Sequence, residues 1–169
     1  MLLPVLALLL VDASPSRHEV AVHAVYPLPR WGVALGYRYA LRERLGVGAT
    51  FEYVMPSRGY LHLPGFEQAL GLSLWRRAVG QGVYVEPQLS FAHSVFYRLP
   101  DQSRHVMRLG GEVGWRLALS RRLSAGVGMG AAYGWSIGAT GSICTFDFQC
   151  ASTRPGAVAR ARVSLGVRW

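Results

Sequence analysis

The stretch WGVALGYRYALRERLGVGATFEYV, residues 31–54, alternates between bulky apolar residues and small or charged ones. Every second residue from Trp31 to Leu41 is Trp, Val, Leu or Tyr, and the residues between them are Gly, Ala or Arg. The alternation resumes after the charged residues 42–44 and continues to Met55. A period of two residues is typical of β-strands, so this stretch predicts a β-hairpin with a short charged turn.

The same period recurs along most of the chain. It predicts eight strands, at residues 19–26, 31–41, 45–55, 67–74, 83–95, 108–119, 123–133 and 158–169. Short turns follow the second, fourth and sixth strands, and we expect longer loops at 56–66, 98–105 and 134–156. Strands joined in this way predict an all-β, antiparallel, up-and-down arrangement.

The two faces of these strands decide which solvent each one meets. Apolar residues make up 51% of the sequence and charged residues 16%, whereas about 25% is usual in soluble domains. If the bulky face pointed inward, the Gly/Ala face would meet water and would be poorly solvated. In the reverse arrangement the bulky apolar face contacts lipid, and the small residues fit the narrow interior of the barrel. Closing the strands into a ring gives the backbone N–H and C=O groups hydrogen-bond partners, which hydrocarbon cannot supply. We therefore expect an eight-stranded transmembrane β-barrel, with a soluble lipocalin-like binding barrel as the alternative.

The small face also carries most of the charges within the strands. We expect these side chains in the lumen: Glu19, Glu52, Glu67, Glu86, Glu112, Arg38, Arg108, Arg116, Arg160, Arg162 and Arg168. Buried charges need partners, and a guanidinium group suits bidentate pairing with a carboxylate. The sequence thus predicts an Arg/Glu network that fills the lumen and leaves no wide pore. His23, on the same face, is expected to be a hydrogen-bonding residue of the lumen rather than a metal ligand.

The formal net charge of +9 raises the question of an anionic partner. All 18 basic residues are arginines, and they are spread along the chain rather than clustered as in most nucleic-acid-binding domains. We expect no nucleic-acid partner. Arginines on the surface can equally bind anionic lipid head groups.

Two local features indicate passage into an oxidising compartment. Residues 1–13 form an apolar run too short to span a bilayer as a helix, followed by a small-x-small site, and they predict a signal peptide ahead of a barrel domain at 14–169. Cys144 and Cys150 lie close together in the longest expected loop, without the further Cys or His residues that a zinc site needs. They predict a small loop disulfide, with two free thiols as the alternative.

With these strands, loops and candidate signal segment, residues 19–169 resemble the small outer-membrane β-barrel proteins of Gram-negative bacteria, of the porin-like type. The closing sequence ARVSLGVRW carries the resemblance furthest. In that family the last strand alternates apolar residues and ends on an aromatic, a signal read by the barrel-assembly machinery. The matching residues here are Val163, Leu165, Val167 and Trp169. The resemblance implies a monomer in the cell outer membrane, with both termini in the periplasm and contacts with membrane lipids and lipopolysaccharide.

This fold hosts passive barrels, adhesins and enzymes, so function must be argued from sites. We expect no enzymatic activity and no cofactor, but a structural or surface-interaction role through the extracellular loops. The alternative is a lipid A-modifying hydrolase, because SFAHSVFYR places His93 near Ser90 and Ser94 and resembles the outer-membrane lipid A deacylases. Neither serine shares the face of His93, however, since Phe91 and Val95 are the residues two positions away.

The remaining aromatic and histidine residues suggest no further site. His62 and His105 are expected in loops, and no metal site is assigned to them. We expect an interfacial aromatic girdle from six residues near strand ends, namely Trp31, Tyr53, Trp75, Trp115, Tyr133 and Trp169.

Overall fold

The computed structural model of the protein describes residues 17–27, 32–54, 62–96, 99–137, 142–144, 150–152 and 156–169. These residues form ten strands: β1 (His18–Pro27), β2 (Gly32–Arg42), β3 (Leu45–Val54), β4 (His62–Trp75), β5 (Gly82–Phe96), β6 (Leu99–Ala118), β7 (Leu123–Ile137), β8 (Ser142–Cys144), β9 (Cys150–Ser152) and β10 (Gly156–Arg168). No helix in the described part of the chain is long and apolar enough to cross a membrane.

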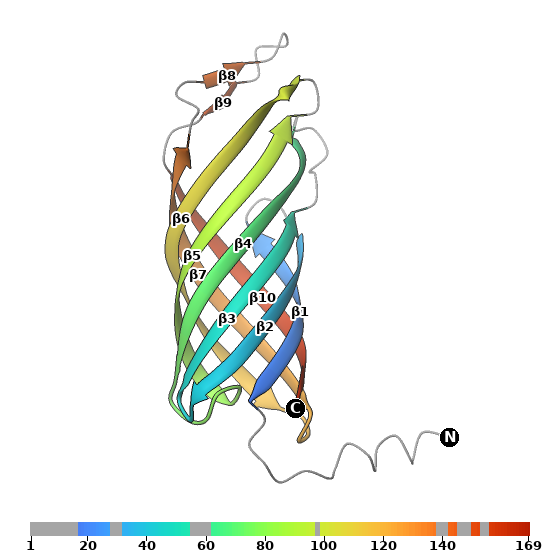
Figure 1. The fold of residues 1–169 in the computed structure, drawn as a ribbon, viewed down its shortest axis with the longest axis vertical. Coiled ribbons are helices and arrows are strands. Elements are labelled where there is room, and N and C mark those ends of the chain that lie inside the picture. The colour runs from blue at the N-terminus through green and yellow to red at the C-terminus, as the bar shows by residue number, and fades with distance from the viewer. Residues whose placement is uncertain are drawn as a thin grey trace, which may run out of the picture.

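Eight of the strands close into an antiparallel barrel in the order β1-β10-β7-β6-β5-β4-β3-β2 (Figure 1). The first and last strands complete the ring, with Glu19 opposite Arg168 and Tyr26 opposite Ala161. Strands β8 and β9 form a separate two-stranded hairpin, which Figure 1 shows beyond one end of the barrel. The predicted fold class is confirmed, and the hairpin lies within the predicted loop 134–156.

One end of the barrel, which we call the turn end, holds three short connections, the start of β1 and the end of β10 (Figure 1). The connections are residues 43–44, 76–81 and 119–122. His18 and Trp169 exchange backbone hydrogen bonds of 3.0 and 3.1 Å, which joins the first and last strands there. In the second connection, Gly80 (φ 81°) and in β5 Gly82 (φ 80°) adopt a backbone conformation that favours glycine.

At the opposite end, which we call the loop end, strands β4–β7 are longer than the sequence predicts. The predicted loops 56–66, 98–105 and 134–156 overlap strand: β4 begins at His62, β6 at Leu99, and β7 continues to Ile137. Polar and proline residues in 99–104 favour a loop in the sequence, but Leu99, Ser103 and Arg104 pair with β5 across a register shift, and β6 extends through this segment. Figure 1 shows β5 and β6 reaching beyond the neighbouring strands.

The side chains along the strands alternate between inside and outside, apart from irregularities such as the register shift between Ala40 and Arg42 in β2. In β2, for example, Leu35 is 55% exposed on the outer surface whereas Ala34 is 1% exposed in the interior. The described buried residues are mostly charged or small, and most large apolar side chains lie on the exterior. This polarity is the reverse of a water-soluble fold, and a closed barrel with such an exterior is suited to span a membrane.

Candidate functional site

The lumen holds two groups of charged side chains, of which the first lies toward the loop end. Glu52 on β3 is directly opposite Glu67 on β4. Arg160, from β10, places Nη1 3.7 Å from Glu52 Oε2 and also forms an ion pair with Glu67. Arg108 on β6 forms a second ion pair with Glu67. Four strands thus meet in one cluster, which we call the loop-end cluster (Glu52, Glu67, Arg108 and Arg160).

The second group, the turn-end cluster (Glu19, Arg38, Glu86, Arg116 and Ser124), lies nearer the turns. Arg38 on β2 joins two carboxylates, with Nη2 2.6 Å from Glu86 Oε2 and Nη1 3.4 Å from Glu19 Oε2. Arg116 on β6 also pairs with Glu19, and the Ser124 hydroxyl donates a 2.6 Å hydrogen bond to it. Because each carboxylate has at least one cationic partner, the burial of these charges is compensated.

Further contacts lie between the two clusters, in the middle of the lumen. Arg162 on β10 places Nη1 3.2 Å from Glu112 Oε2, and the Tyr84 hydroxyl donates a hydrogen bond to the same glutamate. Arg116 donates a 3.1 Å hydrogen bond to Ser164 on β10. All five inward glutamates therefore have an arginine partner.

Trp75 differs from its predicted place in the interfacial girdle. It is 4% exposed inside the barrel, where its indole N–H donates a 3.0 Å hydrogen bond to Ser73. Its ring lies 4.6 Å from that of Tyr84, and the guanidinium of Arg38 lies 5.2 Å from the Trp75 ring centroid. The reason is parity: Leu74 points outward on β4, so the next residue points inward.

The other predicted girdle residues behave differently. Trp115, Tyr133 and Trp169 are exposed on the outside, and Tyr53 is half-buried. Trp31 lies outside the described residues.

Arg168 lies on the inward face as predicted but has another kind of partner. Its guanidinium donates a 3.0 Å hydrogen bond to the backbone carbonyl of Ser120, in the turn between β6 and β7. No ion pair to a glutamate of the described chain accompanies it. Arg168 thus fastens the last strand to a turn, and it also interacts electrostatically with Glu19 and Arg116 of the turn-end cluster.

The free space next to two of the described lumen arginines is small. Two voids of about 20 and 10 Å³ lie beside Arg160 and Arg38 respectively. Each is about the size of a single water molecule. The buried His23 lines the smaller void, and its Nδ1 has no hydrogen-bond partner among the described residues.

The His93 region forms a different pair from the one considered in the sequence. His93 Nδ1 lies 3.2 Å from His105 Nδ1, directly across β5 and β6 on the outer surface. His105 is thus on a strand, so its predicted place in a loop is wrong, as is that of His62, with which β4 begins. Ser90 is buried on the opposite, inward face, and the side chain of Ser94 lies outside the described part. No group of three or more metal-ligating residues occurs among the described residues.

Three other predicted features lie at or beyond the limits of the described structure. The backbone of β8 and β9 places Cys144 opposite Cys150, but their side chains are not among those described, so the disulfide stays a prediction. The predicted signal peptide, residues 1–13, lies outside the described residues. The proposed assembly signal is described: Val163, Leu165 and Val167 point outward along β10, and Trp169 is exposed at the turn end.

A closed eight-stranded barrel with an apolar exterior and an ion-paired lumen defines a small transmembrane β-barrel of the outer-membrane type. No protein-family model matches the sequence, and no curated protein matches it.

Solved structures do match. The N-terminal β-barrel domain of Pseudomonas aeruginosa OprF is 10% identical, covers 94% of this chain and 100% of that domain, and has a TM-score of 0.55. Neisserial surface protein A is 12% identical over 89% of this chain and 92% of that one, with a TM-score of 0.48. A de novo designed transmembrane β-barrel is 14% identical over 94% of this chain and 100% of that one, with a TM-score of 0.46. The OprF domain confirms, at the level of fold, the resemblance stated from the sequence.

Proposed function

We propose that the protein spans the outer membrane as a monomeric barrel with a structural or surface-interaction role. The turn end faces the periplasm, and the loop end faces the exterior, where the loops contact lipopolysaccharide or other surfaces. The observation that carries this proposal is the reversed polarity of the barrel, with exposed leucines such as Leu35 and Leu165 outside and paired ions inside. Such an exterior is stable in lipid, whereas in water it would be a large aggregation-prone surface.

The lumen network supports a plugged barrel rather than an open channel. The loop-end and turn-end clusters each draw side chains from strands on different sides of the ring, so their ion pairs cross the lumen. A solute passing through would have to separate these buried pairs, at several kcal/mol for each unpaired charge. The voids beside them are too small for an organic solute.

The two alternative functions have less support. A hydrolase would need a nucleophile within hydrogen-bond reach of His93, but Ser90 lies on the other face of β5 and the described partner of His93 is His105. A lipocalin-like barrel would need its bulky side chains and a ligand cavity inside, but these side chains are outside. Neither arrangement matches the described residues.

The experiment that tests the proposal combines folding and conductance. The protein is refolded into detergent and phospholipid vesicles and examined by gel electrophoresis of heated and unheated samples and in planar bilayers. It is also incubated with lipid A, whose mass is then measured. We expect heat-modifiable migration, no lasting open-pore conductance and unchanged lipid A, in the wild type as in the His93→Ala control. Solubility without detergent would contradict the membrane proposal. A steady large conductance would contradict the plugged lumen, and lipid A modification that the His93→Ala substitution abolishes would support the hydrolase instead.

A further inference from the structure

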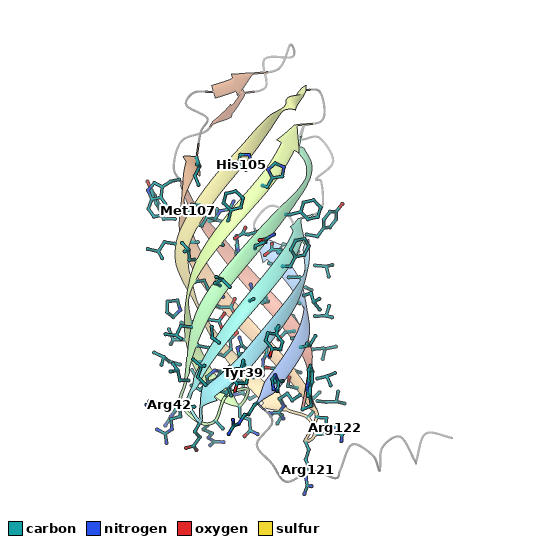
Figure 2. All side chains as sticks on the ribbon, in the orientation of Figure 1. Tyr39, Arg42, His105, Met107, Arg121 and Arg122 are labelled. Carbon is teal, nitrogen blue, oxygen red and sulfur yellow. The ribbon has the colours of Figure 1, made fainter. Side chains whose placement is uncertain are left out.

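The turn end concentrates positive charge that the lumen does not explain. Each of its three turn regions carries two arginines: Arg42 and Arg44, Arg76 and Arg77, Arg121 and Arg122. Arg42, Arg121 and Arg122 lie at this end and point away from the barrel (Figure 2). We call these six residues the arginine rim.

The rim accounts for most of the protein's net charge. The lumen holds six arginines against five glutamates and is almost neutral. At the turn end, by contrast, the rim and Arg17 face one acidic residue, Glu43. This end therefore carries six of the nine net positive charges of the sequence.

The arginine rim lies at the edge of the apolar exterior. Exposed leucines adjoin it in each turn region: Leu41 directly precedes Arg42, Leu74 lies two residues before Arg76, and Leu119 lies two residues before Arg121. A guanidinium beside such a leucine lies where the hydrocarbon of a bilayer gives way to head groups. A patch meant for a soluble ligand would have no reason to follow this boundary.

The turns that carry the rim are also held in place. Trp75 N–H donates to the Arg44 carbonyl at 2.9 Å, and Val79 N–H donates to the Glu43 carbonyl at 2.8 Å, which joins two turns. In the third turn, Arg168 N–H donates to the Arg122 carbonyl at 2.7 Å. The arginine pairs are thus fixed at three separate places around the ring, between β2 and β3, β4 and β5, and β6 and β7.

We propose that the arginine rim binds the phosphate groups of anionic phospholipids in the leaflet that surrounds the turn end. Guanidinium groups donate paired hydrogen bonds to phosphate oxygens, and the excess charge favours anionic over zwitterionic head groups. A ring of separated pairs fits many small lipid head groups better than one long soluble polyanion. The inference rests on the proposed insertion into a membrane and adds the lipid class that one end selects.

The test measures lipid selectivity in nanodiscs of phosphatidylcholine that contain spin-labelled phosphatidylglycerol or spin-labelled phosphatidylcholine. Electron paramagnetic resonance gives the fraction of each labelled lipid that the barrel immobilises. We expect the wild type to prefer phosphatidylglycerol by roughly fivefold, with the preference falling as salt is added. Replacing all six rim residues by glutamine should reduce the preference to about onefold. Replacing them by lysine should keep most of it, because the charge remains.

Glu43→Gln provides a variant that acts in the opposite direction. It removes the acid of the turn end and should increase the preference for phosphatidylglycerol, and it keeps the proposal testable if the sixfold variant does not fold. Equal preference in the wild type, the glutamine variant and Glu43→Gln would overturn the proposal. The proposal would also be overturned if the rim bound soluble heparin and the lipid preference did not depend on the rim arginines. Heat-modifiable migration of each sample separates these results from a failure of the barrel to insert.

Discussion

Glu52 and Glu67 lie directly opposite each other across β3 and β4, 2% and 3% exposed, in the interior of the barrel. Like charges in facing positions destabilise a sheet, and burial increases the cost. Arg160 contacts both carboxylates from β10, and Arg108 contacts Glu67 from β6. The loop-end cluster therefore depends on cations from strands far from the glutamates in sequence.

Removing the shared cation should be costly. Arg160→Gln leaves Glu52 without its ion-pair partner and Glu67 with Arg108 alone. We expect the free energy of unfolding to fall by about 3–5 kcal/mol, because an unpaired charge stays buried. Urea unfolding in phospholipid vesicles measures this change.

Two further variants make that measurement specific. Adding Glu52→Gln to Arg160→Gln should recover part of the lost stability, because it removes the unpaired carboxylate. Arg76→Gln changes an exposed arginine of the rim and should alter stability by no more than about 0.5 kcal/mol. Equal effects of Arg160→Gln and Arg76→Gln would show that the buried pairing contributes nothing.

Two glycines on β6 lie on opposite faces of the strand, with Gly114 facing the crowded lumen and Gly111 on the exposed outer face. A Cβ atom at Gly114 would lie 2.5 Å from the ring of Tyr84, which is confined by Trp75 and hydrogen-bonded to Glu112. At Gly111 the nearest atom would be 3.6 Å away. We expect Gly114→Ala to cost about 1–3 kcal/mol and Gly111→Ala to be neutral or slightly stabilising. Parallel urea unfolding of both variants checks this, and a tolerated Gly114→Ala would mean that Tyr84 is not tightly packed.

The exterior should penalise charge according to depth. Leu70, 64% exposed near the middle of β4, is expected to lie in the hydrocarbon, whereas Leu119 is at the turn end. Leu70→Arg should destabilise the folded barrel by about 2–4 kcal/mol, and Leu119→Arg by about 0–1 kcal/mol. Unfolding in vesicles measures both, and equal small costs would contradict a lipid-facing position for Leu70.

The facing positions of Cys144 and Cys150 lead to a redox prediction. Directly opposed residues of an antiparallel pair have Cα atoms close enough for a disulfide. We expect the protein isolated from the outer membrane to contain this disulfide, so that its mass is two hydrogens below that of the reduced form. Its cysteines should resist alkylation until a reductant is added. Intact-mass spectrometry tests this, and full alkylation without reductant would show free thiols.

Much of the fold is predictable from a single property, the two-residue period. Because side chains in a strand alternate between faces, Leu35 outside and Arg38 inside follow from position alone once the solvent of each face is assigned. The same parity, applied at the end of the fourth strand, places Trp75 inside. Its assignment to the girdle rested on residue type, which overrode parity and was wrong.

The contacts between side chains across the lumen are much harder to predict from the sequence. The sequence groups the inward charges but does not show that Arg160 reaches Glu52 and Glu67, since these partners depend on the tilt and register of the closed ring. Tyr84, Ser124 and Ser164 join the network in the structure without a local signal beyond their inward parity. The extension of β6 to Leu99 was missed because pairing with β5 outweighs the loop-forming composition of residues 99–104.

The orientation of neighbouring side chains tests the central claim most directly. Single cysteines are placed at Leu35 and Leu165, and at their inward neighbours Ala34 and Ser164, with both native cysteines replaced by serine. In vesicles, a fluorescent label at Leu35 and Leu165 should be quenched by brominated lipid, while Ala34 and Ser164 should resist labelling because they are buried. The opposite pattern, with accessible inward positions and unlabelled leucines, would show that the apolar face forms a sealed core and would contradict the account.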